Sequence, residues 1–330
     1  MDKQQNIERM WQTLEQEQKA PQNADLLHLS NLLEEDIQRF SKAWQNLTTQ
    51  ERQKLIEALN ALAENDFEVD FNAIFRLALQ DKDATIREVA IDSLWEDEDV
   101  RLIPELIHFL QEDEVEKVRL SAAQGLAHFI LLGETKKIRP RPFEMACKAL
   151  LNTCRDREES IEVRRRALES LAYAGLKEVE DLIQEAYLHP EESMKLSAVF
   201  AMGRSANDQW KKTIIRELQN SNPAMRYEAT RACGELAARE AVSEIIELTE
   251  DVDIEVQETA LWALGQIGGN QARQTLKCYT QSENEALREA AIDALNELEF
   301  FHGDLDSLFN PPDSFEEEDE DWDLLPPQNT

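Results

Sequence analysis

The sequence predicts an all-α protein, built as an α-solenoid of stacked helical hairpins, and two observations support this. Ala, Leu, Glu, Gln and Arg dominate its 330 residues, which include only 9 Gly and 10 Pro, and this composition favours helices over strands and turns. A short helical pattern also recurs seven times, with a constant spacing of 31 residues over its later copies. A fixed period of about 20 to 50 residues is typical of solenoids.

The first predicted element is an N-terminal helical cap at residues 1–66. The stretch LTTQERQKLIEALNALAE begins with a capping box formed by Thr48 and Glu51, in which the two side chains bind amide groups at the start of a helix. Apolar residues follow at helical spacing, namely Leu55, Ile56, Leu59 and Leu62.

The repeats occupy residues 67–303, and each is identified by an anchor residue in its second helix. The anchor follows an apolar residue and precedes an Ala by three positions and a larger apolar residue by seven. The seven anchors are Arg87, Arg119, Arg164, Lys195, Arg226, Gln257 and Arg288. An apolar helical pattern precedes each copy, so every repeat is predicted to be a hairpin, and stacking is needed to bury its apolar face.

Two details of the repeat predict local contacts. A residue type that caps helices stands four positions before five anchors: Asp83, Ser160, Asn222, Asp253 and Asn284. Their side chains are expected to accept hydrogen bonds from free amides. The anchor arginines are expected to bind turn carbonyls or a neighbouring turn Asp, which is a structural role.

The turn Asp or Asn, the apolar-Arg pair, the small Ala and the Leu-Gly ending resemble the HEAT repeat, in particular the short HEAT-like repeat of the phycobilisome lyase type. The resemblance is clearest in DIEVQETALWALGQIGG (253–269) and NPAMRYEATRACGEL (222–236), and it covers roughly residues 71–301. It implies a right-handed superhelix of about seven HEAT-like hairpins. Gln257 departs from the usual basic anchor and is expected to weaken the contact between repeats there.

Two segments depart from the period. Arg119 and Arg164 are 45 residues apart, so an inserted loop is expected at about residues 130–143. Residues 304–330 contain ten acids and four Pro without Lys or Arg, which predicts a disordered acidic tail. Three roles for this tail stay open: it docks on the basic residues of this chain, it binds a separate basic partner, or it only aids solubility. The basic residues are Lys136, Lys137, Arg139, Arg141, Arg155, Arg157, Arg164, Arg165 and Arg166.

Charge restricts the partners. With 68 acidic and 35 basic residues, the net charge is −33, which opposes binding to nucleic acids and anionic membranes. No apolar run approaches the roughly 20 residues of a membrane span, and no signal-peptide core is present. We therefore expect a cytoplasmic monomer whose protein partner offers basic or apolar segments. The four cysteines are expected to be buried and reduced: Cys147, Cys154, Cys233 and Cys278.

Motifs for chemistry are lacking. The sequence has no GxGxxG, GxxxxGK[ST], GxSxG or HExxH motif. HEAT-like hydroxylases hold two iron ions through repeated His-Glu pairs, whereas none of the five His here precedes Glu. No catalytic residue, metal or cofactor is expected. Two functions stay open because HEAT arrays serve many roles: a scaffold or adaptor that binds a partner segment in its concave groove, and a lyase-type or enzyme-associated protein that handles a chromophore or modified substrate.

The candidate groove follows from the helix period. At 100° per residue, positions 1, 5, 8 and 9 after the anchor point away from the packed side of the second helix, and the resemblance places second helices on the concave side. The candidate contact residues are Tyr173, Leu196, Phe200, Arg204, Tyr227, Arg231, Trp262 and Gln266. Aromatics interleaved with arginine are typical of interface centres. Two alternatives stay open: cover by the tail or by strong curvature, and a helix rotation that buries these residues.

Overall fold

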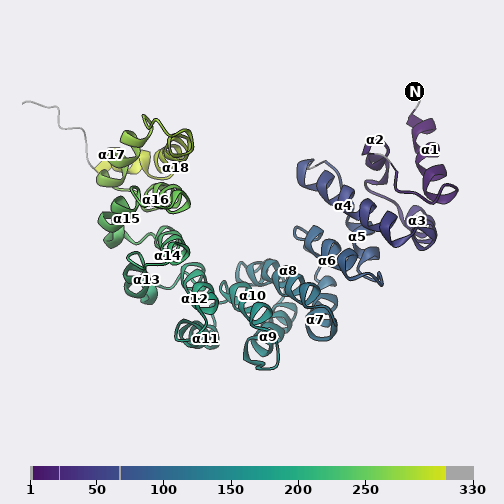
Figure 1. Cartoon of the computed structure of the whole chain (residues 1–330), viewed down its shortest axis with the longest axis horizontal. Helices are drawn as coiled ribbons and strands as arrows, with labels where there is room; N and C mark the ends of the chain where they lie inside the picture. Colours follow the sequence, from purple (N-terminus) through teal and green to yellow (C-terminus); the bar gives the residue numbers. More distant parts are fainter. Residues whose placement is uncertain (1–2, 22, 67, 310–330) are drawn as a thin grey trace, which may run out of the picture. The chain divides into compact units, whose positions relative to one another are not determined.

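The computed structural model describes residues 3–21, 23–66 and 68–309, and within these ranges the regular elements are all helices (Figure 1). The chain divides into two compact units, Met1–Ile214 and Ile215–Thr330. We describe each unit separately. The prediction of an all-α solenoid is confirmed.

The N-terminal part of unit 1 is helical, as the cap prediction requires. Its elements are α1 (Lys3–Glu15), α2 (Asn23–Leu26), a 3₁₀ turn (Leu27–Leu29), α3 (Glu34–Asn46) and α4 (Thr49–Asn65). The Thr48 hydroxyl accepts a hydrogen bond from the Glu51 amide at 3.3 Å. The Glu51 carboxylate, however, accepts one from the Ala20 amide at 2.8 Å. Only half of the predicted capping box is therefore seen, because Glu51 ties α4 to the connection after α1.

Four hairpins follow in unit 1. They are α5 (Asn72–Ala78) with α6 (Ala84–Ser93), α7 (Leu102–Glu112) with α8 (Glu116–Glu134), α9 (Pro140–Arg155) with α10 (Ile161–Leu171), and α11 (Lys177–Tyr187) with α12 (Glu192–Arg204). The second helices contact one another in chain order, from α6 to α8, α10 and α12. Helix α4 packs on α6 in the same way, so the series of second helices begins within the predicted cap.

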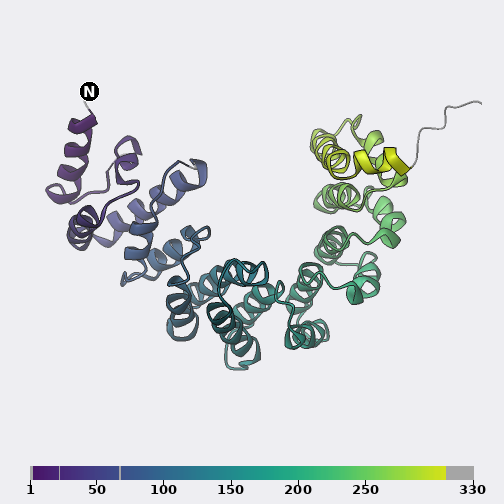
Figure 2. The same cartoon turned by 180° about the vertical axis from the view of Figure 1, so that it is seen from behind.

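Unit 2 contains the later hairpins, and the unit boundary falls within α13. The 3₁₀ turn Asp208–Trp210 and the start of α13 (Lys211–Glu217) still belong to unit 1. After the end of α13, the elements of unit 2 are α14 (Pro223–Glu235), a 3₁₀ turn (Arg239–Ala241), α15 (Val242–Leu248), α16 (Ile254–Ile267), α17 (Asn270–Tyr279) and α18 (Glu285–Phe309). Helix α16 lies between α14 and α18 and contacts both. Figure 2, the view from behind, shows the helices of this unit following one another in chain order.

The predicted helix phase is correct on the core side. Three positions of the pattern face the core: the residue before the anchor and the residues three and seven positions after it. In α10, α12 and α16 they are buried, and only Met194 keeps a small exposure. These residues are Val163, Ala167 and Leu171, Met194, Ala198 and Met202, and Val256, Ala260 and Leu264. The prediction is wrong for position eight after the anchor, which was expected to point away from the packed side. The residues at this position in three repeats, Gly203, Gly234 and Gly265, are buried.

All five predicted caps form. The side chains accept hydrogen bonds from the amide two or three residues later, and the pairs are Asp83 with Ile86, Ser160 with Val163, Asn222 with Ala224, Asp253 with Glu255, and Asn284 with Ala286. The start of each of these second helices is therefore fixed by a local side chain.

The prediction of an inserted loop at residues 130–143 is wrong. Helix α8 runs to Glu134 and α9 starts at Pro140, so only residues 135–139 connect them. The extra residues lengthen two helices instead. A Cβ atom on Gly133 would clash with the Phe143 ring, so glycine lets the two helices approach closely where they are joined.

Two further expectations need revision. Residues 304–309, assigned to the acidic tail, belong to α18, while residues 310–330 lie outside the described residues. Three cysteines are buried as expected, but Cys278 on α17 is exposed. Leu276, two residues earlier, takes the buried position on that short helix.

Candidate functional site

The anchor arginines form a series of contacts that we call the arginine ladder. Arg87 shows the pattern: its Nε and Nη2 atoms donate to the Asp113 carboxylate at 2.8 and 2.9 Å. Its Nη1 atom donates to the carbonyl oxygens of Asp81 and Lys82 at 3.0 and 3.1 Å. The arginine thus joins the turn of its own hairpin to the acid that ends the first helix of the next one.

The same pattern recurs in both units. In unit 1, Arg119 donates to Glu159 at 2.8 and 2.9 Å and to the Asp113 carbonyl at 2.9 Å. In unit 2, Arg226 donates to Asp251 at 2.6 and 2.7 Å. These hydrogen bonds hold the pKa of the Asp251 carboxyl below its usual value. The structural role predicted for these anchors is confirmed.

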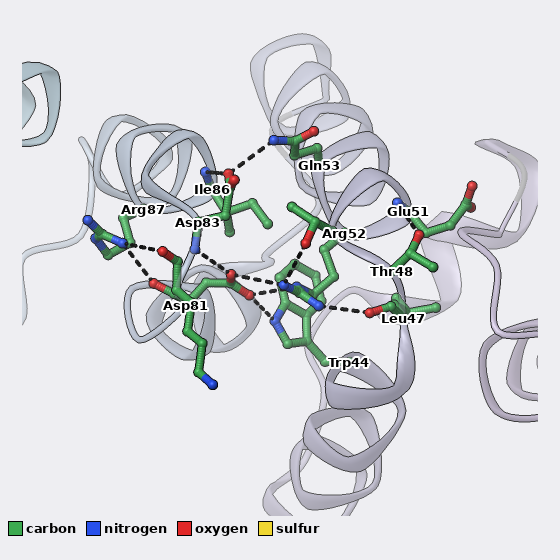
Figure 3. Close-up of polar contacts among 12 residues, drawn as sticks. Trp44, Leu47, Thr48, Glu51, Arg52, Gln53, Asp81, Asp83, Ile86 and Arg87 are labelled. Atoms are coloured by element: carbon green, nitrogen blue, oxygen red, sulfur yellow. Dashed lines mark hydrogen bonds and ion pairs between the residues drawn. The ribbon is translucent and has the colours of Figure 1, made fainter. Parts of the chain in front are cut away.

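The ladder starts earlier than the sequence pattern indicated (Figure 3). Arg52 in α4 pairs with Asp81 at 2.8 Å and donates to the Leu47 carbonyl at 2.7 Å. Asp81 also accepts a hydrogen bond from the indole of Trp44 at 2.8 Å, and its side chain is only 4% exposed. Arg52 does not fit the repeat pattern, because Glu51 precedes it and Leu55 stands where other repeats have Ala.

Four anchors lack a carboxylate partner among the described residues, namely Arg164, Lys195, Gln257 and Arg288. The Nε atom of Arg164 donates only to the Cys154 carbonyl, at 3.2 Å. Gln257 donates to the Asp251 carbonyl at 2.6 Å, so this shorter side chain keeps the turn contact but not the contact with the next repeat. Arg288 donates to the Ser282 carbonyl at 2.9 Å. We call a step of the ladder closed where the anchor pairs with a carboxylate of the next hairpin, and open where it does not.

Four of the predicted contact residues lie in unit 1, on α12 or just after α10, and all are half-buried: Tyr173, Leu196, Phe200 and Arg204. The guanidinium carbon of Arg204 lies 5.8 Å from the ring centroid of Tyr173 and 5.4 Å from that of Phe200. Such distances allow a cation to interact with both aromatic rings. The structure thus brings three of these four residues together as one cluster.

The other four lie in unit 2, on α14 and α16, and are also half-buried: Tyr227, Arg231, Trp262 and Gln266. Trp262 covers Gly234 of the preceding second helix, where a Cβ atom would lie 2.6 Å from the indole Cζ3. Gln266 donates to Glu297 at 2.5 Å. Trp262 and Gln266 therefore lie over seams between second helices rather than projecting freely from one helix.

A cavity of about 470 Å³ adjoins Trp262 on its other side. The residues of α18 that line it are Ala290, Asp293, Ala294, Asn296 and Glu297. The indole and two carboxylates, those of Asp293 and Glu297, thus line the same open space. An aromatic face beside carboxylates suits a cationic side chain better than an anionic one.

Three further features of the described residues concern the cysteine thiols, metal ligands and membrane spans. Burial raises the pKa of the Cys154 thiol to about 12, and that of Cys147 to about 12 as well, so both stay protonated at neutral pH. In the part of the chain that the structure describes, no three His, Cys, Asp or Glu side chains gather closely enough to hold a metal ion. Across residues 3–21, 23–66 and 68–309, no helix combines the length and apolar character that crossing a membrane requires.

Comparison with known proteins bears on the fold. Residues 212–296 match the family model of HEAT repeats. Among solved structures, the chain resembles importin beta, with 14% identity, a TM-score of 0.49, and coverage of 89% of this chain and 47% of that one. For the complex of CpcE and CpcF of phycocyanin lyase from Nostoc sp. PCC7120, the identity is 17%, the TM-score 0.43, and the coverage 59% and 76%.

A third similar structure is human deoxyhypusine hydroxylase, at 17% identity and a TM-score of 0.34, covering 90% of this chain and 96% of that one. The comparison with curated proteins returned no match. The helical hairpins and the family match lead to one conclusion. The chain is an α-solenoid of HEAT-like helical hairpins, with HEAT repeats matched at residues 212–296.

Proposed function

We propose that the protein is a non-enzymatic scaffold or adaptor, cytoplasmic and monomeric, that binds a segment of a partner protein on the faces of its second helices. The observation that supports this is the exposure of the eight candidate residues. Each is half-buried, although five of them are aromatic or aliphatic side chains. The cores of both units are filled by other residues, and a partner would contact the solvent-exposed part of these eight side chains.

The chemistry of the partner segment follows from the surroundings of Trp262. Asp293 and Glu297 are both exposed and line the same cavity as the indole. A Lys or Arg side chain of a partner would lie against the aromatic ring and pair with a carboxylate. The net charge of −33 also attracts basic segments at long range. A segment that combines basic and apolar residues is the expected ligand.

The test uses one variant in each unit. Trp262→Ser in unit 2 and Phe200→Ser in unit 1 remove half-buried rings outside the core. Leu188→Ser is the matched control, because Leu188 is 71% exposed and lies in the turn after α11, away from the second helices. Partners captured from native lysate by the wild-type protein are identified by mass spectrometry, purified, and titrated against each variant.

We expect both aromatic variants to weaken binding while helicity measured by circular dichroism and the Leu188→Ser titration stay unchanged. A partner that binds all variants equally would contradict the proposed faces. An absorbance scan of the purified protein addresses the other function class: a bound chromophore would replace the scaffold proposal with the lyase-type one.

A further inference from the structure

A second cavity, of about 630 Å³, lies wholly within unit 1 between the hairpins α9–α10 and α11–α12. Three arginines line it together with a histidine: Arg155, Arg157, Arg164 and His189. Leu168, Leu182 and Met194 supply buried apolar parts of the wall. The cavity therefore combines a cationic part with an apolar part, although the chain as a whole is strongly acidic.

The cavity occupies the place of a missing step in the arginine ladder. In three closed steps, at Asp81, Asp113 and Asp251, the acid that receives the arginine also accepts a hydrogen bond from the amide two residues later. Asp113 accepts one from Val115, and Asp251 accepts one from Asp253, both at 2.9 Å. The Nδ1 atom of His189 accepts the same hydrogen bond from the Glu191 amide at 3.1 Å. His189 thus holds the position that an acid holds in these three steps.

Replacing the acid by His189 changes the group that faces the arginine from an acceptor to a donor. Because Nδ1 of His189 accepts a hydrogen bond, the proton of the neutral ring lies on Nε2, which is a donor. Arg164 offers only donors, and its single hydrogen bond within the described residues goes to the Cys154 carbonyl. At this step Arg164 and His189 therefore both present donors, whereas at the equivalent step in unit 2 Arg226 donates to the acceptor Asp251. An acceptor is needed to join Arg164 and His189.

The other charged groups that line the cavity add to this requirement. Arg155 and Arg157 are exposed and bring two further guanidinium groups. Glu185 on α11 is the one carboxylate among the lining residues, and it too is exposed. Three guanidinium groups against one carboxylate leave the cavity with a net positive charge.

We propose that this cavity binds a small amphipathic anion whose oxyanion group, a phosphate or a carboxylate, takes the place of the missing acid between Arg164 and His189. Guanidinium groups bind both kinds of oxyanion through paired hydrogen bonds. The apolar wall receives the rest of the ligand, and the volume lies in the range of about 300 to 1,000 Å³ that small-molecule sites occupy.

The experiment is calorimetric titration of the full chain with three probes: phenyl phosphate, phenylacetate and inorganic phosphate. We expect saturable binding with one molecule per chain, tighter for the aromatic anions than for inorganic phosphate. Binding of phenyl phosphate alone identifies the group as a phosphate, while equal binding of phenylacetate shows that a carboxylate suffices. Absence of saturable binding by all three probes at millimolar concentrations would overturn the proposal.

Variants place the binding in this cavity. Arg164→Gln should weaken binding by about 10- to 100-fold, the usual effect of losing a hydrogen bond to a charged group. Arg226→Gln is the matched control, because it removes a ladder arginine that has its own carboxylate, and it should leave binding unchanged. Arg157→Gln, at an exposed position, should weaken binding with no effect on folding. Equal affinity of the wild type and both cavity variants would show that the anions bind elsewhere.

Discussion

Two steps of the arginine ladder, one in each unit, share a backbone arrangement but differ in outcome. In unit 2, Arg226 of α14 makes two hydrogen bonds to Asp251 and two to the carbonyls of Asn220 and Ser221. In unit 1, Arg164 of α10 makes one hydrogen bond to a carbonyl and borders a cavity. The repeat thus preserves the helices and the turn, while a single side chain decides whether the seam between hairpins is closed or open.

The largest expected effect separates these two steps directly. Arg226→Gln should lower the free energy of unfolding by about 3 kcal/mol, because it leaves the nearly buried Asp251 carboxylate without its partner. Arg164→Gln should lower it by less than about 1 kcal/mol, since one neutral hydrogen bond is lost. Urea denaturation monitored by circular dichroism measures both values. Equal losses would mean that the ladder contributes no stability beyond its contacts with turn carbonyls.

A second comparison concerns two glycines on second helices. A methyl group on Gly234 would lie 2.6 Å from Trp262 and 3.1 Å from the Cα of Ala263, whereas one on Gly125 in unit 1 would meet Leu106 at an ordinary 3.4 Å. Gly234→Ala should therefore destabilise by about 2 kcal/mol through overpacking. Gly125→Ala should be neutral or stabilise by up to about 1 kcal/mol, since Ala favours the helix. Thermal denaturation of the two variants distinguishes the sites, and an unchanged melting temperature for Gly234→Ala would contradict the close approach.

The open step can also be closed by design. His189→Asp places a carboxylate where Asp251 stands in unit 2, and it should pair with Arg164 and raise the free energy of unfolding by about 1 kcal/mol or less. His189→Asn is the control, because Asn220 already accepts the amide of Asn222 at 2.9 Å in the equivalent turn without adding charge. The same urea titration applies. A gain in both variants would assign the effect to the turn rather than to the ion pair.

The smallest effect is a dependence on pH. The pKa of Asp251 is lowered in the folded protein, first of all by its hydrogen bonds with Arg226. The stability from this pair is therefore present above the unfolded pKa of about 3.9 and is lost as the pH falls through the lower, folded pKa. The stability difference between the wild type and Arg226→Gln should narrow on acidification below pH 4. A difference that stays constant down to the acid transition would rule out the ion pair as its source.

Much of the fold was predictable because its determinants are local in sequence. The 31-residue period, the caps such as Ser160 and Asp253, and the buried side of each second helix all follow from residues within one hairpin. The connection at residues 130–143 was predicted wrongly because a spacing counts residues and does not say whether they extend a helix or form a loop.

The candidate site was less accessible to sequence reasoning. The half-buried state of Trp262 depends on Gly234, which lies in another repeat. The eight candidate contact residues themselves remain a prediction. The cationic cavity was not predictable from the sequence, because it depends on the contrast between His189 and the acids at equivalent positions. These positions are defined by the contacts of the arginine ladder.

The ladder also has a direction along the chain. Each arginine is synthesised before the acid that binds it, as Arg52 precedes Asp81 and Arg87 precedes Asp113. During synthesis, domains begin to fold from the N-terminus, so a newly released hairpin keeps its cation unpaired until the first helix of the next hairpin emerges. We therefore expect nascent chains that end just before Asp81 or Asp113 to be more sensitive to protease than chains one hairpin longer, in steps that follow the repeat.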